Sequence, residues 1–156
     1  MPAILTRELT ALLIQDFPES IVCVMVVFSF LCLRFDFKKI TAIAVLQTVT
    51  NLVRLLPIAF GVHTVVLVIS LAVYVHLITK IRLSRVFLTV IGTFVICGLV
   101  EMIYMMPLLN LTGRTYEEFF ANPVLRELYS LPYELVLLAV ALGKNYYNRR
   151  RGKISA

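Results

Sequence analysis

Two stripes of polar side chains interrupt long apolar runs in this sequence. In the first, Gln47, Asn51 and Arg54 recur at positions i, i+4 and i+7, which places them on one face of a helix. The second stripe, at a spacing of four residues, consists of Thr89, Thr93, Cys97 and Glu101. An ionisable side chain at the centre of a membrane-spanning helix costs about 2.5–3.5 kcal/mol, so such a group marks a ligand or ion site or pairs with another group.

The segments around these stripes are those of an integral membrane protein. Of the 156 residues, 60% are hydrophobic, and the mean hydropathy is +0.92. Soluble domains contain about 45–50% apolar residues. The cysteines, Cys23, Cys32 and Cys97, are odd in number and lack a C-x-x-C spacing, which argues against a disulfide framework or a metal site. The sequence therefore predicts an all-α membrane bundle, with the lipid bilayer as its first partner.

Five segments approach the roughly 20 apolar residues that a spanning helix needs. They predict a single transmembrane domain over residues 1–156, with helices at about 17–35, 40–60, 62–79, 85–109 and 130–147. Asp16 and Glu19 have the spacing of a capping box, which predicts that the first span begins after Asp16 and that a short interfacial helix precedes it. Helix-start signals at Thr115 and Asn122 predict short surface helices between the fourth and fifth spans.

Lysine and arginine are distributed unevenly over the two sides of this predicted bundle. Of the 15, eleven fall in the first and third connections and in the tail, and four fall on the other side. The positive-inside rule then predicts a multi-pass protein of the cell membrane, with its N-terminus outside and its C-terminus in the cytoplasm. The basic residues of the tail are Lys144, Arg149, Arg150, Arg151 and Lys153. They form a topology anchor, or a surface for anionic lipid or a signalling partner.

Four ionisable groups fall in the outer half of the predicted bundle: Arg54, His63, Glu101 and Glu134. One interpretation is an ion pair of Arg54 with Glu101 or Glu134 that fixes the register of two helices, at about 0.6 kcal/mol per polar contact. The other is an outward-facing pocket, with Gln47 and Asn51 on its wall, for a peptide, lipid or small molecule. The sequence leaves both interpretations open.

Catalysis has little support in the sequence. His63 has no cysteine or serine partner at a recognisable spacing, and no acidic pair carries a protease signature. The glycines do not form a phosphate-binding loop. We therefore expect that the protein is not an enzyme, that it uses no cofactor or metal and that it does not bind nucleic acid.

Punctuating residues in the apolar segments carry a family resemblance. The stretch "VRLLPIAFGVHT", residues 53–64, and the later "NPVLRELYSLP", residues 122–132, resemble the membrane input region of certain sensor histidine kinases. These are the AgrC-like kinases of Firmicutes, which carry a GHKL-type ATPase domain. The resemblance implies a bacterial sensor of an outside signal. This sequence contains neither a phospho-acceptor histidine on a cytoplasmic helix nor a nucleotide-binding segment, so the resemblance implies an input module that acts through a partner.

Three hypotheses follow from the sequence. The first is a sensor-like or regulatory membrane protein whose outer pocket binds a ligand and whose last helix and tail act on a partner. The second is a small membrane subunit of a transporter, in which Glu101 meets a substrate or cation. The third is a structural scaffold that only packs against other membrane proteins.

Overall fold

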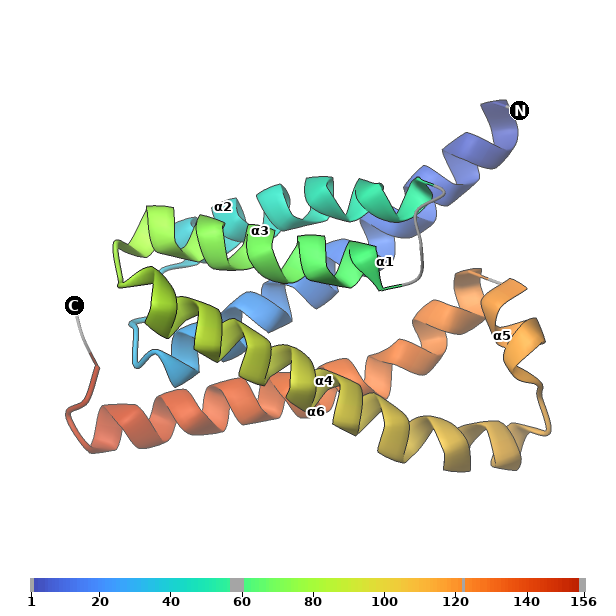
Figure 1. The fold of residues 1–156 in the computed structure, drawn as a ribbon. Coiled ribbons are helices and arrows are strands. Elements are labelled where there is room, and N and C mark those ends of the chain that lie inside the picture. The colour runs from blue at the N-terminus through green and yellow to red at the C-terminus, as the bar shows by residue number, and fades with distance from the viewer. Residues whose placement is uncertain (1, 57–60, 122, 155–156) are drawn as a thin grey trace.

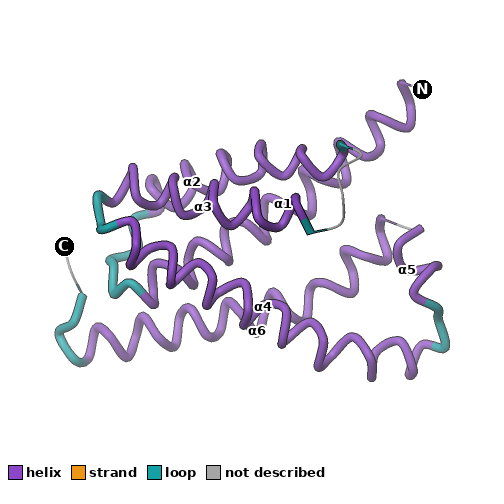
Figure 2. Tube along the Cα trace, viewed as in Figure 1, coloured by secondary structure: helices purple, strands orange, loops and turns teal. Residues whose placement is uncertain are grey.

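The computed structural model describes residues 2–56, 61–121 and 123–154. Within these residues all regular structure is helical. The elements are α1 (Pro2–Phe30), α2 (Phe37–Asn51), the 3-10 helix η1 (Leu52–Leu55), α3 (Val62–Thr79), α4 (Leu83–Thr112), α5 (Tyr116–Ala121) and α6 (Pro123–Arg150). The five longer helices form an up-and-down bundle (Figure 1), and Figure 2 shows that short connections join them at one end.

Helix α1 is the central helix of the bundle. It packs against α2, α4 and α6, whereas α3 packs against α2 and α4. Its side chains Val24, Val26 and Val27 have no exposed surface, and Phe28 is 1% exposed. These residues form the middle of an apolar core around the second half of α1, and the surrounding helices contribute Val75, Val90 and Leu137. The same core contains Leu31, Ile40, Ile43, Val86 and Ala141.

Three helices in the described part of the chain are long and apolar enough to cross a membrane. They are α3, α4 and the Leu13–Phe30 part of α1. More than half of the α1 segment is buried inside the protein, at 56%, against 22% for α3 and 17% for α4. The outer surfaces of α3 and α4 therefore present apolar side chains such as Val65, Leu88 and Ile103 to the surroundings, as expected for helices that face lipid.

The first helix differs from its prediction. Asp16 does not cap a helix, and no separate interfacial helix precedes it, because α1 is continuous from Pro2 to Phe30 and has Pro18 inside it. Lipid offers no hydrogen-bond partner to a broken backbone, so continuing the helix keeps the N–H and C=O groups paired, and a spanning helix tolerates the one bond that proline removes. Asp16 is only 1% exposed in the helix interior.

The second helix is shorter than its prediction of residues 40–60. Asp36 caps it by accepting a hydrogen bond from the Lys38 backbone N–H at 3.1 Å, and α2 ends at Asn51. The chain tightens into η1, and Leu56 is extended, with φ −78° and ψ 141°. The ring of Pro57 disfavours a helical conformation at the preceding residue, which accounts for this ending. Pro57 itself and the predicted end at Phe60 lie outside the described residues.

Two later helices begin or end away from their predicted bounds. Helix α3 covers the residues predicted for the third span, and α4 extends the predicted 85–109 at both ends until Gly113, at φ +62°, stops it. The start at Thr115 is confirmed, because the Glu118 N–H donates to the Thr115 Oγ1 at 3.4 Å. The predicted second surface helix and the start of the last span near residue 130 are wrong. Proline at the first helical position fits the start of α6, and this one helix then continues through Pro132.

The two cationic connections and the basic tail lie at the same end of the bundle. Figure 1 shows the α1–α2 turn, the α3–α4 turn and the end of α6 together on one side, and the start of α1, the start of α3 and α5 on the other. Near the cationic end a polar clamp joins α1 to α6. The Ser29 Oγ donates to the Ala141 carbonyl oxygen, and the Asn148 Nδ2 donates to the Ser29 carbonyl oxygen, each at 2.7 Å.

We expect Asn148→Ala to weaken the packing of α6 on α1. Asn148 is 2% exposed, so its loss removes a buried interhelical hydrogen bond and leaves the Ser29 carbonyl without this donor. The expected loss in the free energy of unfolding is about 0.6–1.7 kcal/mol. The measurement is thermal unfolding of the purified protein in detergent. Asn110→Ala, at an exposed position of α4, is the matched control, and equal losses in both variants would contradict the clamp.

Candidate functional site

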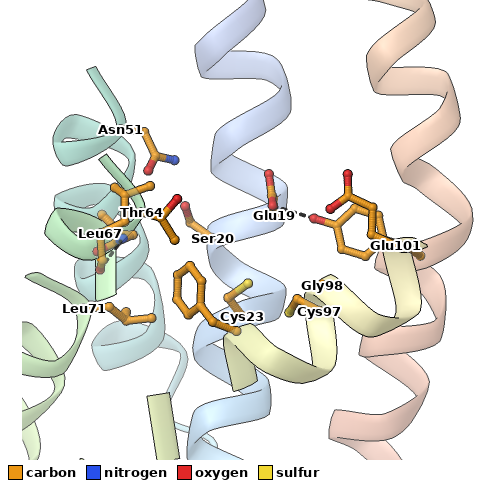
Figure 3. A pocket seen from close by; sticks show the side chains of 13 residues that line it. Glu19, Ser20, Cys23, Asn51, Thr64, Leu67, Leu71, Cys97, Gly98 and Glu101 are labelled. Atoms are coloured by element: carbon orange, nitrogen blue, oxygen red, sulfur yellow. Dashed lines mark hydrogen bonds between the residues drawn. The ribbon is translucent and has the colours of Figure 1, made fainter. Parts of the chain in front are cut away.

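A cavity of about 250 Å³ lies between the five long helices, and its wall includes the end of α2 and the start of α3, away from the cationic connections. Each of these helices contributes to its wall. The residues that line it are Glu19, Ser20, Cys23, Gln47, Asn51, Thr64, Leu67, Leu71, Phe94, Cys97, Gly98, Glu101 and Tyr133. Figure 3 shows Glu19, Cys23 and Cys97 facing this space from α1 and α4. A cavity shared by five helices changes shape when any one of them moves.

Three of the predicted pocket residues lie together at this cavity. Gln47 and Asn51 line it from α2, and Glu101 lines it from α4. Gln47 is 5% exposed and also bridges two helices. Its Nε2 donates to the Leu67 carbonyl oxygen at 3.2 Å, and its Oε1 accepts from the Ser70 Oγ at 3.2 Å. Gln47 therefore holds α3 against α2 at the wall of the cavity.

Of the other three predicted residues, two are not among the residues that line the cavity, and the side chain of the third is outside the described part of the structure. His63 lies in the first turn of α3 and is half-buried, but its neighbour Thr64 lines the cavity in its place. Glu134 is buried and accepts a hydrogen bond from the Ser130 Oγ at 3.3 Å, while Tyr133 is the residue of α6 at the cavity. Arg54 belongs to η1, and its side chain lies outside the described part of the structure. The pairing of Arg54 with an acid therefore stays a prediction.

Sequence reasoning missed the contribution of α1. Glu19, Ser20 and Cys23 all line the cavity, although Glu19 was assigned to helix capping. A signal was available, because Asp16, Ser20 and Cys23 have the i, i+4, i+7 spacing that identified the stripe on the second helix. The capping interpretation concealed this stripe, because it placed Asp16, its first residue, at a helix end together with Glu19.

Glu19 is held by a residue from the far end of the sequence. The hydroxyl group of Tyr133 on α6 donates to the Glu19 Oε1 at 2.5 Å, as the dashed line in Figure 3 shows. The Tyr133 ring stacks with that of Tyr104, with centroids 6.2 Å apart, and the Tyr104 hydroxyl donates to the Tyr129 carbonyl oxygen. This chain of contacts ties α1, α4 and α6 together beside the cavity and fixes the position of the Glu19 carboxylate.

The described lining is acidic on one side and apolar on the other. It holds the carboxylates of Glu19 and Glu101, and no lysine, arginine or histidine is among the lining residues whose side chains the structure describes. Leu67, Leu71 and Phe94 supply the apolar part. Such a wall suits a small molecule that carries a positive charge or several hydrogen-bond donors together with an apolar group. Within the described residues no cluster of three or more histidine, cysteine, aspartate or glutamate side chains could hold a metal ion.

The basic tail at the opposite end is an ordered helix end. Gly152 adopts φ +63°, the Lys153 N–H donates to the Asn148 carbonyl oxygen at 3.0 Å, and the Gly152 N–H donates to the Arg149 carbonyl oxygen at 3.1 Å. This is the hydrogen-bond pattern of a Schellman cap. Tyrosine rings support the cations: Lys144 and Arg151 lie 5.4 Å and 4.7 Å from the Tyr147 centroid, and Arg150 lies 5.3 Å from that of Tyr146.

Comparison of the chain with protein-family models, with curated proteins and with solved structures gives no match. The site is therefore assigned from its own geometry.

The acidic wall leads to a prediction about which small reagents reach the cavity. In a Cys32→Ser, Cys97→Ser variant, Cys23 is the one remaining thiol. We expect the cation 2-aminoethyl methanethiosulfonate to label it at least about tenfold faster than the anion 2-sulfonatoethyl methanethiosulfonate, relative to their rates with a free thiol, because a cleft of one charge concentrates counter-ions. Labelling rates measured by mass spectrometry check this.

The chain supplies its own control for this measurement. A Cys23→Ser, Cys97→Ser variant keeps Cys32, which lies in the turn after α1, two residues before Arg34. There the preference for the cation should disappear. Glu19→Gln together with Glu101→Gln should also remove it at Cys23, and an unchanged ratio in that variant would contradict the role of the carboxylates.

Proposed function

We propose that this chain is a five-span, sensor-like membrane protein that binds a small ligand in the cavity between its helices and acts on a partner through α6. The observation that carries the proposal is the cavity itself, because all five long helices meet there and two carboxylates line it. Its volume of about 250 Å³ also limits the size of the ligand. An apolar cavity of about 150 Å³ admits benzene, so a molecule on the order of ten non-hydrogen atoms fits, or one side chain of a peptide.

In the five-span arrangement, α2 with η1 and α6 cross the membrane in addition to the three apolar helices. Helix α2 has 15 residues and η1 has four. At 1.5 Å per residue for the first and 2.0 Å for the second, they reach about 30 Å together, the thickness of the hydrocarbon core. Helix α6 has 28 residues, or roughly 42 Å, and has tyrosines at its two ends, where they suit the membrane interfaces.

The orientation that we propose places the cationic end in the cytoplasm. The basic connections lie together with the tail at one end of the bundle (Figure 1), and the positive-inside rule assigns that end to the cell interior. The cavity then lies in the outer half of a multi-pass protein of the cell membrane. The N-terminus is outside.

The length of α6 is the reason for proposing signalling. One uninterrupted helix carries Tyr133 at the cavity and Arg149 at the basic end, 16 positions apart, which corresponds to roughly 24 Å. A ligand that displaces Tyr133 from Glu19 therefore moves a helix whose other end is the surface for a signalling partner. The resemblance to the input region of AgrC-like sensor kinases of Firmicutes favours the same role in a bacterium.

The inner half of the bundle favours a sensor over a transporter. Below the cavity, the core residues Val27, Phe28, Val75, Val90 and Leu137 are at most 1% exposed. This packed apolar layer separates the cavity from the cationic end within the described structure. A ligand in the cavity can thus change helix positions, but a path to the other side would require the layer to open.

The orientation can be measured directly. A reporter that is fluorescent only in the cytoplasm, fused after Ala156, should be active, and a reporter active only outside, fused at the same position, should be silent. Exchanging the six basic residues of the two connections for glutamine, with the tail unchanged, should reduce the difference in activity between the two reporters. Activity of only the outside reporter on the natural sequence would overturn the orientation and with it the outer position of the cavity.

The partner can be sought through the tail. We expect a protein that co-purifies with the chain in mild detergent to be lost when Arg149, Arg150 and Arg151 are replaced by glutamine, because the charge and the cation–π contacts that order this end are removed. The matched variant carries the same three-charge change at Arg34, Lys38 and Lys39. Retention of the partner by the tail variant would contradict a docking role for α6.

A further inference from the structure

Two of the three cysteines meet at the cavity wall. Cys23 on α1 and Cys97 on α4 both line the cavity, and the two side chains lie close enough to interact with each other. Figure 3 shows both side chains facing the same space from neighbouring helices. Cys32 lies apart, in the turn after α1 with φ +58°, and is not among the lining residues. All three are free thiols.

We propose that Cys23 and Cys97 are a thiol-oxidation site, at which a disulfide bond forms between α1 and α4 beside the cavity. Both thiols face the same cavity from adjacent helices, and a disulfide bond between them needs a final sulfur–sulfur separation of about 2.0 Å. A relative shift of α1 and α4 closes the remaining gap. The contact joins residues 74 positions apart in the sequence, so spacing alone does not reveal it.

The reaction balances with hydrogen peroxide as the two-electron oxidant. One thiol sulfur attacks a peroxide oxygen and becomes a sulfenic acid, and one water molecule leaves. The second thiol sulfur then attacks the sulfenic sulfur, the S–O bond breaks, and a second water molecule leaves with the remaining proton. Two thiols and one peroxide thus give one disulfide and two water molecules. Peroxide is close to water in size, and the polar cavity of about 250 Å³ admits it.

The position of the pair connects oxidation to the acidic wall. Cys23 lies four residues after Glu19 on α1, and Cys97 lies four residues before Glu101 on α4. Each cysteine is therefore one helical turn from a lining carboxylate. A disulfide between them fixes the separation of the two helices at the level of the carboxylates. With the cavity on the outer side of the membrane, the bond forms where disulfides persist.

The test is to count thiols on the full-length protein in detergent. After exposure to hydrogen peroxide and then denaturation, maleimide–polyethylene glycol should attach to one cysteine in place of the three of the reduced protein, and dithiothreitol should restore three. With Cys32→Ser the count should fall from two to zero. With Cys23→Ser both remaining thiols should stay reactive. Three reactive thiols after oxidation, or a loss that dithiothreitol does not reverse, would overturn the proposal.

A measurement on the natural sequence makes the result independent of how the variants fold. Digestion of the oxidised protein without reduction, followed by mass spectrometry, should identify a peptide containing Cys23 joined to one containing Cys97. Linkage of either to Cys32, or between two copies of the chain, overturns the proposal. Neither experiment contains a ligand or a partner, so a negative result here leaves the sensor-like function to be judged by its own tests.

Discussion

The arrangement of the whole bundle depends on the burial of α1. This helix is surrounded by α2, α4 and α6, and four side chains between Val24 and Phe28 have at most 1% of their surface exposed. A helix in that position must be apolar on nearly every face where it meets its neighbours. It also brings polar residues to the interior, because more than half of its Leu13–Phe30 segment is buried. The same burial that packs the core therefore gathers Glu19, Ser20 and Cys23 at one cavity.

Much of the fold follows from the composition and the helix-breaking residues of the sequence. The helical class, the residues of α3, the capped start at Thr115 and the grouping of the basic connections at one end can be deduced from local signals. The ends of α1 and α6 cannot. Asp16 resembles a helix start because Glu19 follows it at the capping-box spacing, and the predicted last span begins near Ser130 in the stretch SLPYE. Pro18 and Pro132 are nevertheless accepted inside helices, because lipid or protein leaves the backbone no other hydrogen-bond partner.

The site was predictable only in part, for a different reason. A stripe of polar residues on one helix shows which face turns inward, as for Gln47 and Asn51, but it does not show which other helix lies opposite. The contacts of Tyr133 with Glu19 and of Cys23 with Cys97 join distant segments, and no periodicity within one helix encodes them. His63 and Glu134 were predicted from their depth in the membrane, and depth does not show which way a side chain points. Each is next to a residue that lines the cavity. A difference of one position on a helix turns a side chain by about 100°.

The prolines inside three of the helices have a mechanical consequence. Pro18, Pro107 and Pro132 lie in α1, α4 and α6, and Pro18 and Pro132 each directly precede a residue that lines the cavity. Each removes a backbone hydrogen bond to the carbonyl group one turn earlier. Each proline is therefore the point at which its helix bends most easily.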